Sequence, residues 1–399
     1  MDKNLVIVGG ARTAMAEYVG TPGYGMFKKL SALELGAIAA KGALQKSGVA
    51  PEQIDHVVMG NALQTSADAL YGARHVGLKA GIPIETPALT VNRLCGSGIQ
   101  SVVDAAQQIL CGDSEVVLAG GMESMSQAPH VIRGAREGMR FGMPPQIEDS
   151  LFASLMDTHC GFYMAQTAEN LAKEYSVSRE EQDEFAFRSH QLGSAAVQNG
   201  LFADEIVPVT VKKGRNEIVV DTDDHIKPDT SLEGLGKLRA AFGKEGTVTA
   251  GNASGIVDGA AALIITTEER AASEGWTVRA KIRSWGVSGV KPETMGFGPV
   301  PSIQSACEKA SVSVSDIDYF EINEAFAAQY LACEKALGLD RDKCNVNGGA
   351  VAIGHPLGAT GTRLLLTLCH QLERGDKALG MASACIGGGQ GIAMLIERG

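Results

Sequence analysis

The sequence predicts an α/β protein made of two copies of one unit, and two observations indicate this fold class. Short apolar segments with strand composition alternate with segments of helical periodicity along the first 120 residues, which is typical of a largely parallel sheet covered by helices. The same order returns later, because residues 43–57 align with residues 306–320 at an offset of 263 positions, and that offset also brings Gly98 to Gly361. An offset held over most of a domain predicts an internal duplication in which each copy has its own sheet.

The elements expected in the first copy carry recognisable signals at their ends. Ser31 and Glu34 are placed to form a capping box at the start of a helix that Gly48 ends. Ser97 begins a second helix with an apolar stripe at helical spacing, and Gly112 ends it. The other expected elements are strands at 5–8, 54–59, 88–93 and 116–119 and a helix at 71–79.

Residues 122–246 have no counterpart in the second copy and are expected to form an inserted domain. The predicted first half is therefore 1–121 with 247–272, and the second half is 273–399. A long polar helix is expected at 178–199, and a strand at 261–265 should complete the first sheet. Basic residues of the insertion either cover a solvated surface or form a local rim for an anionic substrate. They are Arg133, Arg136, Arg140, Lys212, Lys213, Arg215, Lys227, Lys237, Arg239 and Lys244.

Composition and charge narrow the class of protein. A chain of 399 residues with a net charge of −11 is unsuited to bulk binding of nucleic acid or of an anionic membrane. No apolar run is long enough to span a bilayer, and residues 1–4 do not begin a secretory signal. The eight cysteines are scattered without CxxC or zinc-like spacing, so we expect no metal and a reducing, cytoplasmic location.

Cys95 lies where the expected strand at 88–93 turns into the helix that starts at Ser97. Helix N-termini present free N–H groups and partial positive charge, which favour the thiolate form that attacks carbonyls. The alternative is that Cys95 is a buried small hydrophobic residue, as many intracellular cysteines are. The stretch by itself leaves both interpretations open.

In the second copy, three stretches fall where the carboxyl ends of parallel strands place active-site loops. Asn323 and Glu324 end an expected strand and either cap the following helix, at 325–337, or belong to a site. His355 is held between a glycine and a proline, which favours a positioned imidazole.

The third stretch ends an expected strand at Cys385 and continues as the glycine-rich run 387–391, whose N–H groups can bind an anion. Neither this run nor 96–98 has the spacing of a dinucleotide fingerprint, and no Walker or metal motif occurs. Two cysteines, one histidine and backbone N–H groups suit covalent acyl transfer, which needs a nucleophile, an acid/base and oxyanion stabilisation.

Together these stretches resemble the thiolase family over essentially the whole chain. The motifs stand in the family's order: NRLCGSG at 92–98, GMESMS at 121–126, TAGNASG at 249–255, NEAFA at 323–327, GGAVAIGHPLGATG at 348–361 and CIGGGQG at 385–391. The resemblance implies a duplicated thiolase-like fold: two βαβ-type halves with mixed five-stranded sheets, layered α/β/α/β/α, plus an inserted loop domain. It also implies an acyltransferase that uses coenzyme A thioesters as substrates, without a cofactor or a metal.

The resemblance implies a role for each candidate catalytic residue. Cys95 would accept the acyl group as a thioester, and Cys385 would exchange a proton with the α-carbon of acetyl-CoA. His355 would activate Cys95 and help bind the thioester oxygen, together with a water held by Asn323. The backbone N–H groups of Cys95 and Gly387 would form a second oxyanion hole.

It further implies that the insertion covers the pantetheine arm of coenzyme A and that the protein is a homodimer or homotetramer, with subunit contacts near residues 125–143. The implied substrate contacts are Ser254 and Ala250 near pantetheine, Lys227 and Arg239 at the phosphates, and Leu155, Tyr163, Met164 and Phe326 at the acyl group. Tyr163 stands where short-chain biosynthetic members often carry histidine. Acetoacetyl-CoA is the expected product, and this departure favours the alternative, longer 3-ketoacyl chains.

Two other interpretations fit the sequence less well. A decarboxylating condensing enzyme of the same fold would carry histidine or asparagine in place of Cys385. An inactive lipid-binding relative would have lost Cys95, His355 or Cys385, and all three are present.

Overall fold

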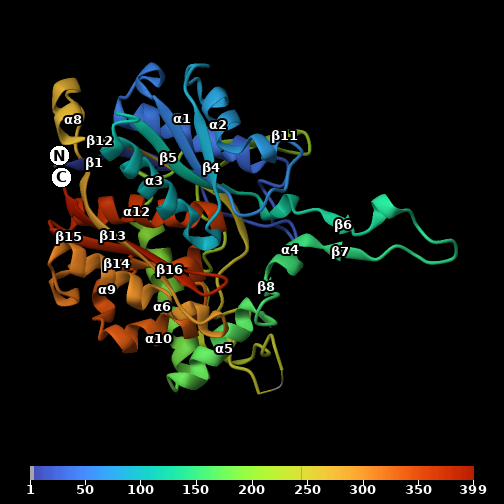
Figure 1. The fold of residues 1–399 in the computed structure, drawn as a ribbon. Helices are drawn as coiled ribbons and strands as arrows, with labels where there is room; N and C mark the ends of the chain where they lie inside the picture. The colour runs from blue at the N-terminus through green and yellow to red at the C-terminus, as the bar shows by residue number, and fades with distance from the viewer. Residues whose placement is uncertain (1–3, 244) are drawn as a thin grey trace.

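The computed structural model describes residues 4–243 and 245–399, so the expectations for Met1, Asp2, Lys3 and Lys244 lie outside the described residues. Within the described residues, the main sheet has ten strands in the order β14-β15-β16-β13-β1-β12-β5-β3-β4, with β2 paired to β12 (Figure 1). The strands are β1 (Leu5–Arg12), β2 (Ala16–Glu17), β3 (His56–Gly60), β4 (Ala88–Val91), β5 (Val117–Glu123), β12 (Val257–Thr267), β13 (Ala280–Gly289), β14 (Tyr319–Ile322), β15 (Leu379–Ile386) and β16 (Gln390–Arg398).

Strand pairing confirms the duplication. In the first half β3 runs parallel to β5 with His56 opposite Val117, and in the second half β14 runs parallel to β15 with Tyr319 opposite Gly380. Both pairs are related by the offset of 263 positions that the sequence shows. The two half-sheets are not separate, because the edge strands β1 and β13 pair antiparallel over two residues. This pairing satisfies backbone groups that two isolated sheets would each leave open at an edge.

Helices cover both faces and fill the space between the half-sheets, as the layered arrangement requires (Figure 1). One outer layer packs on the first half-sheet, a second outer layer packs on the other, and the central helices share one apolar core with strands of both halves. The outer helices are α1 (Ala32–Ser47) and α2 (Gly72–Ala80) on the first half and α9 (Pro299–Ala310) and α10 (Ala327–Leu337) on the second; the central pair is α3 (Ser97–Cys111) and α12 (Leu357–Arg374). The short helices α8 (Glu268–Glu274) and α11 (Ala350–Ile353) complete the two halves.

Most expected element ends are confirmed. The capping box joins Ser31 and Glu34, and α3 begins at Ser97 and ends before Gly112, whose φ of 82° is the left-handed cap that glycine favours. Three strands are longer than expected: β1 continues to Arg12, β5 continues past its glycines to Glu123, and β12 begins at Val257. The extensions of β5 and β12 pair with each other, since Gly259 lies opposite Glu123.

The central helices cross at two glycines that the duplication relates. A Cβ atom on Gly98 would lie 2.4 Å from the backbone nitrogen of Thr362, and one on Gly361 would lie 2.3 Å from that of Ile99. The Thr362 hydroxyl donates to the Gly98 carbonyl at 3.1 Å across the same crossing. The helices therefore touch backbone to backbone at this point.

We expect Gly361→Ala to lower the free energy of unfolding by about 3 kcal/mol, because the new methyl group meets rigid backbone rather than a movable side chain. Urea denaturation followed by circular dichroism measures the change. Gly236→Ala is the matched control, since its Cβ would have no atom within 4 Å, and it should leave stability nearly unchanged. Equal stability of the two variants would contradict a backbone-to-backbone crossing.

The insertion between β5 and β12 forms helices and three two-stranded hairpins beside the two halves. Its longest excursion, the arm, comprises residues 130–149 and extends away from the body with β6 and β7 at its base (Figure 1). No helix within the described residues is long and apolar enough to cross a membrane. The elements are α4 (Ser150–Ser154), α5 (Met164–Glu174), α6 (Arg179–Gln198), α7 (Leu232–Gly236), β6 (His130–Ile132), β7 (Ile147–Asp149), β8 (Met156–Asp157), β9 (Phe162–Tyr163), β10 (Val209–Lys213) and β11 (Asn216–Val220).

Candidate active site

Cys95 sits in a tight turn between β4 and α3 that hydrogen bonds hold in an unfavourable backbone conformation. The preceding residue, Leu94, has a φ of 47°, a left-handed value that is uncommon for a residue with a branched side chain. Its N–H donates to the Asn92 side chain at 2.9 Å, and its carbonyl accepts the Ser97 hydroxyl at 2.7 Å. Strain fixed in this way is a recurrent feature of functional sites.

The backbone N–H groups of Cys95 and Gly387 act on the Cys95 thiol and lower its pKa. These are the two groups that the family resemblance assigns to an oxyanion hole. Burial acts in the opposite direction and raises the pKa of the Cys95 thiol to about 11, and the negative charge of Glu123 adds to this rise. In the free protein, desolvation therefore outweighs the thiolate-favouring effect that we expect of the helix N-terminus.

His355 follows α11 and precedes α12, and its ring is 6% exposed. Its Nδ1 lies 2.6 Å from the hydroxyl oxygen of Thr360, and that hydroxyl donates to the Pro356 carbonyl at 3.2 Å. Because the hydroxyl hydrogen is used on the carbonyl, Nδ1 carries the ring hydrogen and Nε2 keeps a free lone pair. Burial, together with the charge of Arg363, lowers the pKa of His355 to about 3, so the ring is neutral and can act as a base.

Asn323 contacts this imidazole: its Nδ2 lies 3.4 Å from Nε2 of His355. The side chain is fully buried, and its Oδ1 has no hydrogen-bond partner within the described part of the chain. Neither Asn323 nor Glu324 caps a helix, because α10 begins only at Ala327. Glu324 instead accepts hydrogen bonds from Ser189 and Asn345 in a buried network, which leaves Asn323 alone facing the histidine.

Cys385 is the next-to-last residue of β15 and lies in a small apolar cluster with Met295 and Ala325, against which Met164 and Phe326 pack. The thiol is fully buried, and burial raises its pKa well above the ordinary value; a negative charge on Cys95 would raise it further. The two cysteines therefore interact electrostatically, although 290 positions separate them. The structure thus brings Cys385 together with two of the four expected acyl contacts, Met164 and Phe326.

The insertion reaches this cluster through an aromatic stack at the start of α5. The Met164 N–H donates to the Leu155 carbonyl at 2.8 Å, which joins the start of α5 to the end of α4. The Tyr163 ring lies 4.9 Å from that of Phe152 and 5.4 Å from that of Phe242. Three of the expected acyl contacts, Leu155, Tyr163 and Met164, therefore form one continuous wall.

The expected coenzyme A contacts are more dispersed. Ser254 reaches the site, since its N–H donates to the Ala325 carbonyl at 3.0 Å, and Ala250 is exposed in the same loop. Lys227 is held by Glu17 at 3.1 Å and by the Tyr24 hydroxyl at 2.6 Å, and Arg239 is exposed. The other basic residues of the insertion do not form one rim; Arg133 pairs with Glu148 on the arm and Lys237 pairs with Glu233 on α7.

Two residues of the site escaped the sequence analysis as functional groups. Thr360 orients His355 from the first turn of α12, and Glu123 places a carboxylate near Cys95. Thr360 lies in the motif at 348–361, five residues after His355, and Glu123 lies in the motif at 121–126, at the end of β5. Both could have been identified in the sequence as polar residues, one in the first turn of a helix and one at the end of a strand.

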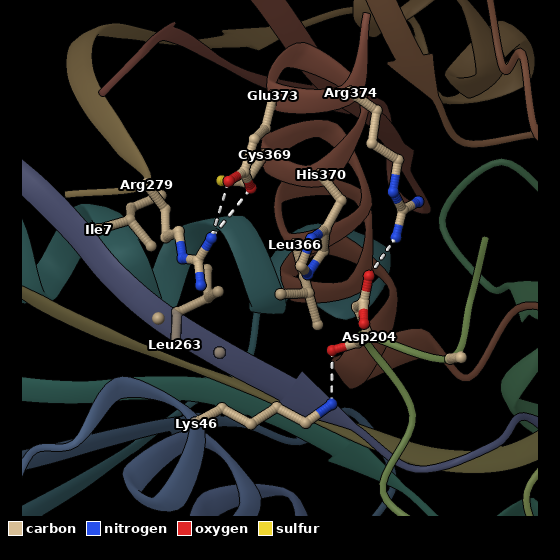
Figure 2. A pocket seen from close by; sticks show the side chains of 13 residues that line it. Ile7, Lys46, Asp204, Leu263, Arg279, Leu366, Cys369, His370, Glu373 and Arg374 are labelled. Carbon is tan, nitrogen blue, oxygen red and sulfur yellow. Dashed lines mark hydrogen bonds and ion pairs between the residues drawn. The ribbon is translucent and has the colours of Figure 1, made fainter. Parts of the chain in front are cut away.

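A separate cavity of about 610 Å³ lies where β1 passes the second half of α12 (Figure 2). Its charged side chains pair with one another or with backbone: Arg374 with Asp204, and Arg279 with Glu373. None of the expected site residues lines it. No group of three or more potential metal ligands occurs within residues 4–243 and 245–399.

Comparisons with known proteins cover the whole chain. Residues 5–269 match the family description "Thiolase, N-terminal domain" and residues 276–398 match "Thiolase, C-terminal domain". The chain is 50% identical to human mitochondrial 3-ketoacyl-CoA thiolase over 99% of its length and 98% of that protein. It is 45% identical to an acetyl-CoA acetyltransferase of Cupriavidus necator over 99% of both. The crystal structure of the human mitochondrial 3-ketoacyl-CoA thiolase in complex with CoA matches with a TM-score of 0.95, covering 100% of this chain and 98% of that one.

Proposed function

The chain belongs to the thiolase family, and we propose that it catalyses the reversible reaction of two acetyl-CoA molecules to acetoacetyl-CoA and CoA. Two observations support the proposal. Cys95 acts electrostatically on Cys385, and Asn323, which contacts the neutral imidazole of His355, donates its backbone N–H to Ser383 on the strand that carries Cys385. Acyl transfer through a thioester requires a nucleophile, an acid/base and oxyanion stabilisation.

In the first half-reaction Nε2 of His355 takes the proton of the Cys95 thiol, and the sulfur attacks the carbonyl carbon of acetyl-CoA. The N–H groups of Cys95 and Gly387 stabilise the oxyanion that forms. Collapse breaks the carbon–sulfur bond to coenzyme A, which leaves as a thiol with the proton from His355. A general base is needed here because the resting thiol has a pKa of about 11.

In the second half-reaction the thiolate of Cys385 removes a proton from the α-carbon of a second acetyl-CoA. The thioester oxygen of this acetyl-CoA would accept a hydrogen bond from a water held on the unpartnered Oδ1 of Asn323, beside His355. The resulting enolate carbon attacks the acetyl group on Cys95, a carbon–carbon bond forms, and the Cys95 sulfur leaves as a thiolate, to which the protonated Cys385 returns the proton. Thiolysis is the same sequence in reverse, and the shared acyl-enzyme gives ping-pong kinetics.

A second candidate is thiolysis of longer 3-ketoacyl-CoA, which is favoured by the 50% identity to human mitochondrial 3-ketoacyl-CoA thiolase and by the exposed aromatic stack around Tyr163. Thiolysis of 3-ketoacyl-CoA substrates from four carbons upward distinguishes the two. We expect kcat/KM to be largest for acetoacetyl-CoA. If kcat/KM is instead largest for a longer substrate, the second candidate replaces the first. If no substrate of the series is cleaved, both candidates are refuted.

The coenzyme A contacts are proposed on weaker geometry. Ser254 and Ala250 would contact pantetheine, because their loop meets the site at Ala325. Arg239 is exposed and free to meet a phosphate, whereas Lys227 would have to share its charge with Glu17.

We further propose a homotetramer built from dimers through the arm, in a reducing cytoplasmic compartment. The arm tip exposes Met139, Phe141 and Met143 by 61%, 106% and 63%, which is costly unless a second copy covers it. All eight cysteines are free, which suits a reducing compartment. Sedimentation velocity gives the mass: four chains support the arm contact, and a monomer contradicts it.

A further inference from the structure

Glu123 ends β5 as a fully buried carboxylate, and no cation of the described part of the chain is among the groups that shift its pKa. Its Oε1 accepts the Asn61 side chain at 2.9 Å and the Leu63 N–H at 3.0 Å. Its Oε2 accepts the Ala62 N–H at 3.1 Å and the Gly358 N–H at 2.9 Å. Four N–H donors fill both oxygens, which is the arrangement that an ionised carboxylate requires.

These donors come from two segments that the fold must hold together. Three belong to the loop after β3, and the fourth, Gly358, is in the first turn of α12, three residues after His355. The same turn lies directly on β5, since a Cβ atom on Gly121 would be 1.8 Å from the Gly358 carbonyl oxygen. Glu123 is therefore a fixed link between β5, the loop after β3 and the segment that carries the catalytic histidine.

We propose that Glu123 is a positioning residue that sets His355 at its working place opposite Cys95. The inference rests on the roles proposed above for these two residues. Thr360 lies two residues after Gly358 in the same first turn and orients the ring through Nδ1, so a shift of this turn would move the imidazole as well. A displacement of about 1 Å at such a group costs on the order of 100-fold in rate.

Glu123 also acts on Cys95 directly, because its negative charge opposes ionisation of the Cys95 thiol. The other charged group that acts on Glu123 is Asp258 of β12; its remaining neighbours are the neutral donors already named. Burial raises the pKa of Glu123 to about 7, so the carboxylate is ionised above that pH. Removing this charge should lower the pKa of Cys95 and so make its alkylation faster at a given alkaline pH.

Glu123→Gln tests the proposal, because the amide keeps the size but turns an NH₂ group toward two N–H donors. We expect kcat for acetoacetyl-CoA thiolysis to fall about 100-fold with the KM for CoA within twofold of wild type. We also expect the pH profile of iodoacetamide labelling at Cys95 to move to lower pH. Glu123→Asp keeps the charge and shortens the reach, so it should lower kcat without moving the profile.

Asp55→Asn is the matched control, since Asp55 accepts the Glu115 and Val116 N–H groups at the opposite end of β5. It should lower stability without changing the KM, the labelling profile or kcat. A Glu123→Gln enzyme with kcat within twofold of wild type, or an unmoved labelling profile, would overturn the proposal. If Glu123→Gln does not fold, Glu123→Asp tests the proposal instead. A Glu123→Asp enzyme with the kcat of the wild type would refute the positioning role of Glu123. Wild-type enzyme that shows neither thiolysis nor labelling at Cys95 would instead refute the proposed function.

Discussion

Cys95→Ala should abolish thiolysis and condensation, with a loss of at least about 10⁴-fold in kcat. Without the thiol no acyl-enzyme forms, and His355 then has no proton to accept. The remaining N–H groups of residue 95 and Gly387 can still bind an oxygen, so coenzyme A thioesters should bind with little change in affinity. Steady-state kinetics with acetoacetyl-CoA and CoA measure the loss of turnover. Mass spectrometry shows whether an acetylated protein still forms.

Cys111→Ala is the matched control, because Cys111 is an exposed free thiol at the other end of α3. It should retain full activity and full acetylation. Iodoacetamide should label Cys95 of the wild type more slowly when acetoacetyl-CoA is present. Turnover by Cys95→Ala near the wild-type rate would end the assignment of the nucleophile.

The overall architecture could be predicted because its signals are local or periodic. The offset of 263 positions appears directly in the strand register, and Ser31, Ser97 and Gly112 mark helix ends through their own chemistry. The prediction that Cys95, His355 and Cys385 share one site also came from the duplication, because it gives both copies corresponding loops at the carboxyl ends of their strands. The pairing of β1 with β13 could not be predicted, because it involves only two residues of each strand and no sequence pattern indicates so short a contact.

Long-range electrostatics were the part that the sequence could not predict. The helix N-terminus near Cys95 was visible, but the burial that raises its pKa depends on side chains from both halves. Lys227 was expected at a phosphate, yet its ion pair is with Glu17, 210 positions away. Glu123 and Gly358 are 235 positions apart, so their contact is a property of the folded chain only.

Cys385→Ser should separate the two half-reactions. The serine hydroxyl fills nearly the same space in the cluster of Met295 and Ala325, but it is far less acidic than a thiol and does not accept an α-proton readily. We expect acylation of Cys95 by acetyl-CoA to persist, while exchange of the α-protons of acetyl-CoA with deuterated water falls about 10³-fold. A burst of CoA release measures the first step, and NMR of the recovered acetyl-CoA measures the second.

Cys333→Ser is the matched control, because Cys333 is a second fully buried thiol that acts electrostatically on Cys385 and donates to the Gly296 carbonyl, which a serine can also do. It should change neither step by more than a few fold. Unchanged exchange in Cys385→Ser would refute the acid/base role and leave Cys385 as a packing residue.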